Sequence, residues 1–241
     1  MIKNRFNIRL TKPIFITLFI LIGIDAILVL LHVFLYDYIP DPKLLIFTRW
    51  GYGETYQYLK GGFIAGYFIF LIIKYRQPSF WSWSAIFLFI VLDDSLELHE
   101  YYGFMVGDYL GLGKTIGEAL VFGFSGIILF IPVIWILLVS KNNLIKDVFI
   151  DLIVLFSLLV LAGVGIDILH DLTINGSLLN SLFGLLEDGG EMVVMSIIVA
   201  YVIALAKIYS DLTKNRKIKH EYRSYNKTKT ASSANSQLNI H

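Results

Sequence analysis

Long apolar runs constrain this chain more than any other feature of its sequence. A helix of about 20 apolar residues, rising about 1.5 Å per residue, crosses the roughly 30 Å hydrocarbon core of a bilayer. Of the 241 residues, 56% are hydrophobic and 16% are charged, whereas soluble domains average about 45–50% apolar and about 25% charged residues. Six segments are long enough to cross: 13–36, 53–74, 81–102, 114–139, 146–171 and 186–209. The sequence therefore predicts an all-α fold, a polytopic membrane bundle of six transmembrane helices.

The distribution of Lys and Arg predicts how this bundle is oriented. Basic residues gather in the N-terminal segment, in the loops "KYRQPS" and "SKNNLIKD", and in the C-terminal tail. These segments alternate along the chain, and positively charged loops face the cytoplasm. We therefore expect both termini to be cytoplasmic, with a basic N-terminus (1–12), a transmembrane domain (13–210) and a basic disordered tail (211–241). The expected setting is a multi-pass protein of the bacterial cytoplasmic (inner) membrane, with the lipid bilayer as partner and no nucleic-acid ligand.

The absence of cysteine limits the kinds of site that the chain can form, and its glycines indicate where helices can pack closely. The chain has no cysteine, which excludes disulfides, thiolate metal sites and cysteine nucleophiles. A bound metal would have to use imidazole, carboxylate or water as ligands. Gly123, Gly126, Gly163 and Gly165 are expected to permit close contacts between helices, as small residues do in membranes.

Ionisable residues gather where three of the predicted helices reach the outer side. The stretch "VLDDSLELHEYYG" (91–103) ends the third helix, "GIDILHD" ends the fifth, and "LEDGGE" opens the sixth. In an unbroken third helix, Asp93, Glu97 and Glu100 would lie within an arc of about 60°, whereas His99 would lie about 160° from Glu97. We therefore do not expect Glu97 and His99 to meet at one centre, and whether His99 faces the site shared between helices is left open.

The carboxylates in these stretches far outnumber nearby cations. Lys60, His32, His99 and His170 cannot neutralise them, and like charges repel strongly in a low dielectric, so either several are protonated or a cation is bound. Single acids at helix ends, such as Asp94 and Asp188, would equally well face head groups. The expected metal ligands are Asp25, His32, Asp93, Glu97, Asp167, His170, Glu187 and Glu191.

This cluster suggests a function at head-group depth. The favoured hypothesis is a metal-dependent membrane enzyme, hydrolytic or oxidative, acting on a lipid or another apolar substrate. Zinc, iron or manganese would activate a water, and Glu97 or Glu191 would act as the general base. One alternative is a proton- or cation-coupled transporter or sensor that uses the buried acids. A second is a non-catalytic assembly protein whose polar groups hold helices together.

Overall fold

The chain folds into a bundle of helices. The computed structural model describes residues 11–35, 50–166, 169 and 178–238, and these residues contain no strand. Its elements are α1 (Lys12–Leu35), α2 (Tyr52–Tyr75), the short 3₁₀ helix η2 (Pro78–Phe80), α3 (Trp81–Leu96), α4 (Leu98–Leu110), α5 (Lys114–Val139), α6 (Asn143–Val160), the π-helical segment η3 (Leu161–Gly165) and α8 (Leu178–Leu238).

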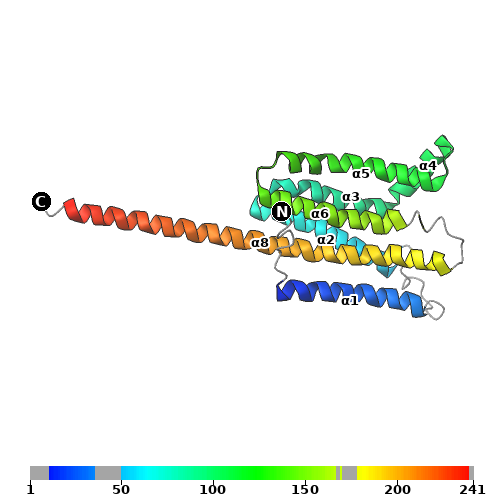
Figure 1. The fold of residues 1–241 in the computed structure, drawn as a ribbon, viewed down its shortest axis with the longest axis horizontal. Helices are drawn as coiled ribbons and strands as arrows, with labels where there is room; N and C mark the ends of the chain where they lie inside the picture. Colours follow the sequence, from blue (N-terminus) through cyan, green and yellow to red (C-terminus); the bar gives the residue numbers. More distant parts are fainter. Residues whose placement is uncertain (1–10, 36–49, 167–168, 170–177, 239–241) are drawn as a thin grey trace, which may run out of the picture.

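Six helices within the described residues are long and apolar enough to cross a membrane, which confirms the predicted helical class and number of spans. They run up and down in succession, so that the start of α1 and the distal part of α8 lie at the same end of the bundle (Figure 1). We call this the terminal end, and the opposite end, beside α4, the cavity end. Large apolar side chains remain exposed on the outer helices, among them Phe19, Ile131 and Trp135. Large apolar surfaces of this kind are rare in soluble monomers, and a lipid bilayer would cover them.

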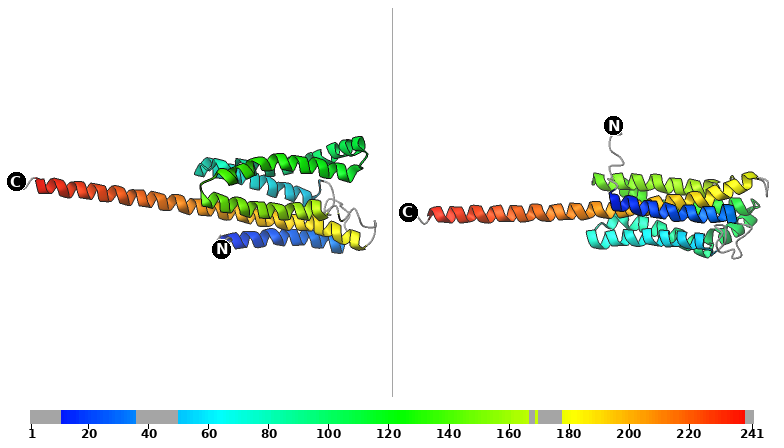
Figure 2. Two further views of the ribbon diagram at one scale, coloured as in Figure 1. Left: turned by 45° about the horizontal axis from the view of Figure 1, so that its top comes forward. Right: turned by 90° about the horizontal axis from the view of Figure 1, so that it is seen from below.

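Several helix boundaries differ from those predicted, and two of the differences matter most. The third spanning helix ends at Leu96 instead of continuing to residue 102, and α4 begins after a break. The last helix, α8, continues to Leu238, where the sequence predicted a disordered tail. No Gly or Pro follows Gly190 up to residue 238, so no residue of the tail breaks the helix that leaves the bundle. Figure 2 shows this helix projecting well beyond its neighbours, with α1 alongside its first half.

The hydrophobic core lies toward the terminal end. There Phe68 of α2 stacks on Phe80 with ring centroids 5.6 Å apart, and Phe80 packs on Phe149 of α6 at 6.0 Å. Trp83 of α3 contacts Phe149 edge-on at 6.0 Å. These four rings are fully buried, and offset or edge-on aromatic pairs add about 0.5–1.5 kcal/mol beyond their burial. The core fixes α2, α3, α6 and α8 at one end and leaves the other end free for polar side chains.

Glycines bring α4 and α5 into backbone contact. A Cβ atom at Gly103 would collide with Glu118 of α5, and one at Gly117 would collide with the backbone of Gly103 on α4. One at Gly107 would collide with the backbone of Gly113. Small residues four apart on facing helices are a common means of close packing in membranes. The same role was predicted for Gly123 and Gly126, and that prediction is wrong, because a Cβ at either would meet nothing within 4 Å.

A buried ion pair joins α1, α2 and α8. Lys60 donates to Asp25 at 2.7 Å, to the Ser196 hydroxyl at 3.1 Å and to the Met192 carbonyl at 2.8 Å. Ser196 in turn donates to the second oxygen of Asp25 at 2.6 Å. The side chains of Lys60 and Asp25 are 3% and 1% exposed. The sequence left open whether Lys60 faces the predicted site, and the structure shows that it pairs with Asp25 instead.

Removing one member of this pair should destabilise the protein far more than removing both. Lys60→Met leaves Asp25 buried without its cation, which costs about 3–5 kcal/mol, whereas apolar replacement of a whole buried pair is often neutral or stabilising. We expect Lys60→Met to lower the melting temperature in mild detergent and Asp25→Leu/Lys60→Met to recover most of that loss. A double variant no more stable than the single one would contradict this account of the pair.

Candidate functional site

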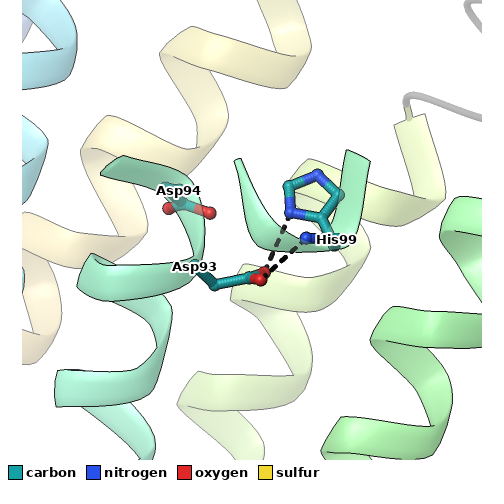
Figure 3. Close-up of side chains that lie close together, drawn as sticks. All are labelled: Asp93, Asp94 and His99. Carbon is teal, nitrogen blue, oxygen red and sulfur yellow. Dashed lines mark hydrogen bonds and ion pairs between the residues drawn. The ribbon is translucent and has the colours of Figure 1, made fainter. Parts of the chain in front are cut away.

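Asp93 organises the break between α3 and α4. Its carbonyl accepts the Glu97 N–H at the end of α3. Its carboxylate accepts the backbone N–H of His99 at 3.0 Å and lies 2.9 Å from Nδ1 of the His99 ring (Figure 3). A carboxylate at a helix N-terminus satisfies free N–H groups and complements the helix dipole. Asp93 thus accepts the last helical hydrogen bond of α3 through its carbonyl and caps α4 through its carboxylate.

Glu97 lies at the turning point in a left-handed conformation, with φ 53° and ψ 40°. Few residues other than Gly adopt this conformation, which costs of order 1–3 kcal/mol and is concentrated at functional sites. Because the chain turns here, Glu97 and His99 no longer have the angular separation of an unbroken helix. Both line the same cavity, contrary to the prediction that His99 lies on another side.

This acidic cavity, of about 300 Å³, lies at the cavity end of the bundle. Its wall is formed by the first turns of α2 and α5, the end of α3, the start of α4, the end of α6 with η3, and the early part of α8. The described lining residues include eight carboxylates and no Lys or Arg: Glu54, Asp94, Glu97, Glu100, Glu118, Glu187, Asp188 and Glu191. Gln57, Tyr58, Thr115 and His99 add neutral or titratable polar groups.

The π-helical segment η3 makes room for one of these carboxylates. A Cβ atom at Gly163 would collide with the carboxylate of Glu191 on α8. The absence of a side chain at Gly163 therefore lets Glu191 rest directly against the backbone of η3. π-Helical turns of this kind occur frequently at functional sites.

Some of the cavity's negative charge is met by neighbouring donors. Glu54 accepts the backbone N–H of Trp50 at 2.8 Å and the Tyr58 hydroxyl at 3.1 Å. Lys114, an exposed residue outside the lining, lies 3.2 Å from Glu118 and 3.5 Å from Glu100. Lys114 thus pairs from the rim with two of the eight carboxylates.

Within the part of the chain that the structure describes, Asp93, Asp94 and His99 form a compact group of possible metal ligands. One ligand atom from each lies within 4.8 Å of the other two, and Figure 3 shows Asp93 turned toward His99 with Asp94 beside it. Two carboxylates and one imidazole suit zinc, manganese or iron and leave coordination positions for water or substrate. Each ligating imidazole is normally oriented by a partner on its other nitrogen.

The structure brings together part of the predicted ligand set. Glu97, Glu187 and Glu191 line the cavity. Asp93 does not line it but contacts His99, which does. Asp25 instead pairs with Lys60, and His32 is buried on α1, none of whose described residues lines the cavity. Asp167 and His170 lie outside the described residues.

Other lining residues were missed as ligands or assigned to the membrane surface. Asp94 and Asp188 were expected to be equally suited to head groups, and Glu54, Glu100 and Glu118 were not among the expected ligands. Their shared depth, at the ends of helices that meet on one side, was the signal that could have grouped them with Glu97.

Comparison with known proteins places this site within a family. Residues 64–205 match DUF8692, described as a domain of unknown function. The chain belongs to the DUF8692 family. The DUF8692 match begins within α2 and ends within α8, so it contains seven of the eight lining carboxylates and His99, while Glu54 and α1 precede it. No curated protein and no solved structure matches the chain.

The Asp93–His99 pair should make stability depend on pH in metal-free protein. The hydrogen bond to Asp93 raises the pKa of His99 above its ordinary value of 6.5, against the opposing effect of burial. A raised pKa means that the pair stabilises fully below about pH 6.5 and that this contribution is lost as pH rises through the folded-state pKa. In chelator-treated protein, the melting temperature should therefore fall from about pH 6 to about pH 9.

His99→Gln removes the titrating group and should flatten this dependence, and Asp93→Asn should do the same by removing the anion. The measurement is thermal unfolding of the three proteins across that pH range. Equal slopes for the wild type and both variants would show that His99 does not report on folding.

Proposed function

We propose that this chain is a multi-pass membrane enzyme that uses a divalent cation to act on a lipid. The observation that carries the proposal is the acidic cavity, in which eight carboxylates and His99 meet without a lining Lys or Arg among the described residues. Isolated charges in a membrane bundle are costly, and buried like charges are more so, unless a cation or protonation offsets them. A divalent cation held by Asp94, His99 and neighbouring carboxylates would offset this repulsion.

Hydrolysis is the reaction class that the residues favour. The cavity lies at the end of the bundle, where water and lipid head groups would both reach it. A bound divalent cation lowers the pKa of a coordinated water, and Glu97 and Glu191, both on the cavity wall, are positioned to accept its proton as general bases. The remaining wall would orient the head group of the substrate.

A proton- or cation-coupled carrier is the second candidate, and one observation favours it. Met192 lines the cavity, and its carbonyl accepts a hydrogen bond from Lys60. The Lys60–Asp25–Ser196 network therefore adjoins the cavity, and a further buried pair, Tyr201 with Asp151 at 3.0 Å, lies nearer the terminal end. Polar groups at several depths are typical of ion pathways.

Cation binding should be visible as a change in thermal stability. A ligand that binds only the folded state at 100 times its dissociation constant adds about 2.7 kcal/mol. Chelation should thus lower the melting temperature in detergent, and zinc, manganese or iron should restore it. The restored increment should shrink on acidification, because carboxylate and imidazole ligands must be deprotonated to bind.

Asp94→Asn/His99→Gln should abolish the response to added metal, and Asp211→Asn, an exposed acid on α8 away from the cavity, should retain it. If neither chelation nor metal changes the melting temperature of the wild type, and elemental analysis finds no stoichiometric metal, the enzyme proposal fails and the carrier becomes the leading candidate.

We further propose that the terminal end of the bundle faces the cytoplasm of a bacterial inner membrane and that the cavity opens on the opposite side. The positive charge of the N-terminal segment and the tail supports this orientation. A phosphatase reporter, active only outside the cytoplasm, should be inactive when fused after His241 and active when inserted after Leu112, in the α4–α5 turn. The reverse pattern would refute the orientation.

A further inference from the structure

Among the described α-helices, α4 alone is not one of the six candidate spans, yet it exposes large apolar side chains. Four of them, each more than half exposed, form what we call the tyrosine stripe: Tyr101, Tyr102, Met105 and Tyr109. At 100° per residue the stripe lies within an arc of about 100°. The opposite side of α4 carries Gly103 and Gly107, through which it packs at the start of α5. The stripe therefore faces away from α5.

The level of α4 along the bundle can be measured on α5, which runs beside it. A Cβ atom at Gly117 of α5 would collide with the backbone of Gly103, so these two residues lie at one level. From Gly117 to the exposed Trp135, nearer the terminal end, α5 rises about 27 Å at about 1.5 Å per residue. Trp is enriched at membrane interfaces. The middle of α4 thus lies about one hydrocarbon thickness, roughly 30 Å, from Trp135.

A second exposed tryptophan, at the start of α3, marks nearly the same inner level. Trp81 precedes by two residues Trp83, whose ring packs edge-on against Phe130 of α5 with centroids 5.9 Å apart. This contact places Trp81 within about 5 Å of the level of Trp135. From Trp81 to its last residue, Leu96, α3 rises only about 22 Å, which is short of the roughly 30 Å hydrocarbon core. The boundary of the hydrocarbon at the cavity end therefore falls within α4.

The chemistry of the tyrosine stripe fits this boundary. A Tyr side chain has an apolar ring and a polar hydroxyl, so at the edge of a bilayer the ring lies in hydrocarbon and the hydroxyl among head groups. On α5, at the level of α4, Ile116 and Leu120 are also exposed. Trp50 and Tyr52, where α2 begins at the cavity end, are exposed as well. Exposed aromatic side chains on two sides of the cavity end are typical of the aromatic belt of a membrane protein.

We propose that α4 crosses the head-group layer at the cavity end and that the tyrosine stripe binds lipid there. The rings would contact the upper part of the acyl chains, and the hydroxyls would donate hydrogen bonds to phosphate or carbonyl oxygens of the lipid. The stripe contains no basic residue, so this contact does not require an anionic lipid. The inference goes beyond the proposed function and needs neither the cation nor the reaction. It also sets the depth of the cavity, because His99 and Glu100 of α4 line it.

The test is site-directed spin labelling of the full-length protein in phosphatidylcholine vesicles. Because the chain has no cysteine, Tyr101→Cys, Met105→Cys and Tyr109→Cys each provide a single site for a nitroxide. Collisions of the nitroxide with oxygen, which concentrates in hydrocarbon, are compared with collisions with a water-soluble nickel chelate. The label should lie deeper in Tyr101→Cys than in Tyr109→Cys by up to about 12 Å, with Met105→Cys between them.

Two exposed positions provide the reference values. Ile127→Cys, within the span of α5, should favour oxygen, and Lys141→Cys, in the turn between α5 and α6, should favour the nickel chelate. The labels in Tyr101→Cys and Met105→Cys should resemble that in Ile127→Cys more closely than that in Lys141→Cys. All five positions are exposed, so a label at any of them displaces no packed side chain.

Nickel collisions in Tyr101→Cys and Met105→Cys as frequent as in Lys141→Cys would place α4 in water and overturn the proposal. Labels reached by neither oxygen nor nickel would also overturn it, because the stripe would then be covered by protein, such as a second copy of the chain. A label in Ile127→Cys that favours nickel would refute the membrane-spanning bundle itself. The response of the melting temperature to metal is measured separately, so a failure of the cation site would leave this proposal intact.

Discussion

The arrangement of the cavity end depends on one side chain, Asp93. Its carbonyl accepts the last helical hydrogen bond of α3, and its carboxylate caps α4 through the backbone and ring of His99. Without this break, Glu97 and His99 would lie on nearly opposite sides of one straight helix. With it, the chain turns, α4 packs on α5 through glycines, and side chains from α3, α4 and α5 reach the same cavity wall.

The bundle separates its packed aromatic core from its acidic cavity along its length. Aromatic side chains pack densely toward the terminal end, the Lys60–Asp25–Ser196 network ties three helices together, and carboxylates occupy the cavity end. A helical membrane protein must satisfy every backbone group within its helices. Two stretches of irregular backbone, at Glu97 and in η3, line the cavity.

The fold class and the spans could be predicted because hydrophobic length is a direct consequence of bilayer thickness. The break at Glu97 could not, since residues 81–102 contain no Gly or Pro to mark it. The capping carboxylate is one acid among several, and its partner lies six residues away. The predicted separation of His99 from Glu97 was wrong for the same reason, because angular positions calculated for a helix apply only where the helix is continuous.

The ion pair shows a second limit of sequence reasoning. Asp25 and Lys60 are 35 residues apart on different helices, and composition alone assigned Asp25 to the metal ligands. The excess of acids in the stretches at one side of the membrane could be counted from the sequence, but which acid pairs with Lys60 depends on helix packing. Whether the remaining carboxylates hold a metal stays a prediction.

At Glu97, the left-handed backbone conformation lowers the stability of the fold, while the side chain adds a carboxylate to the cavity wall. Glycine is the residue that adopts this conformation most easily, so Glu97→Gly would relieve strain of about 1–3 kcal/mol while deleting a carboxylate from the cavity wall. Selection for thermal tolerance alone would therefore favour a substitution here that selection for the site would reject. An engineered, more robust version of this protein would be expected to acquire such a change early, and to retain its shape while its cavity lost one negative charge.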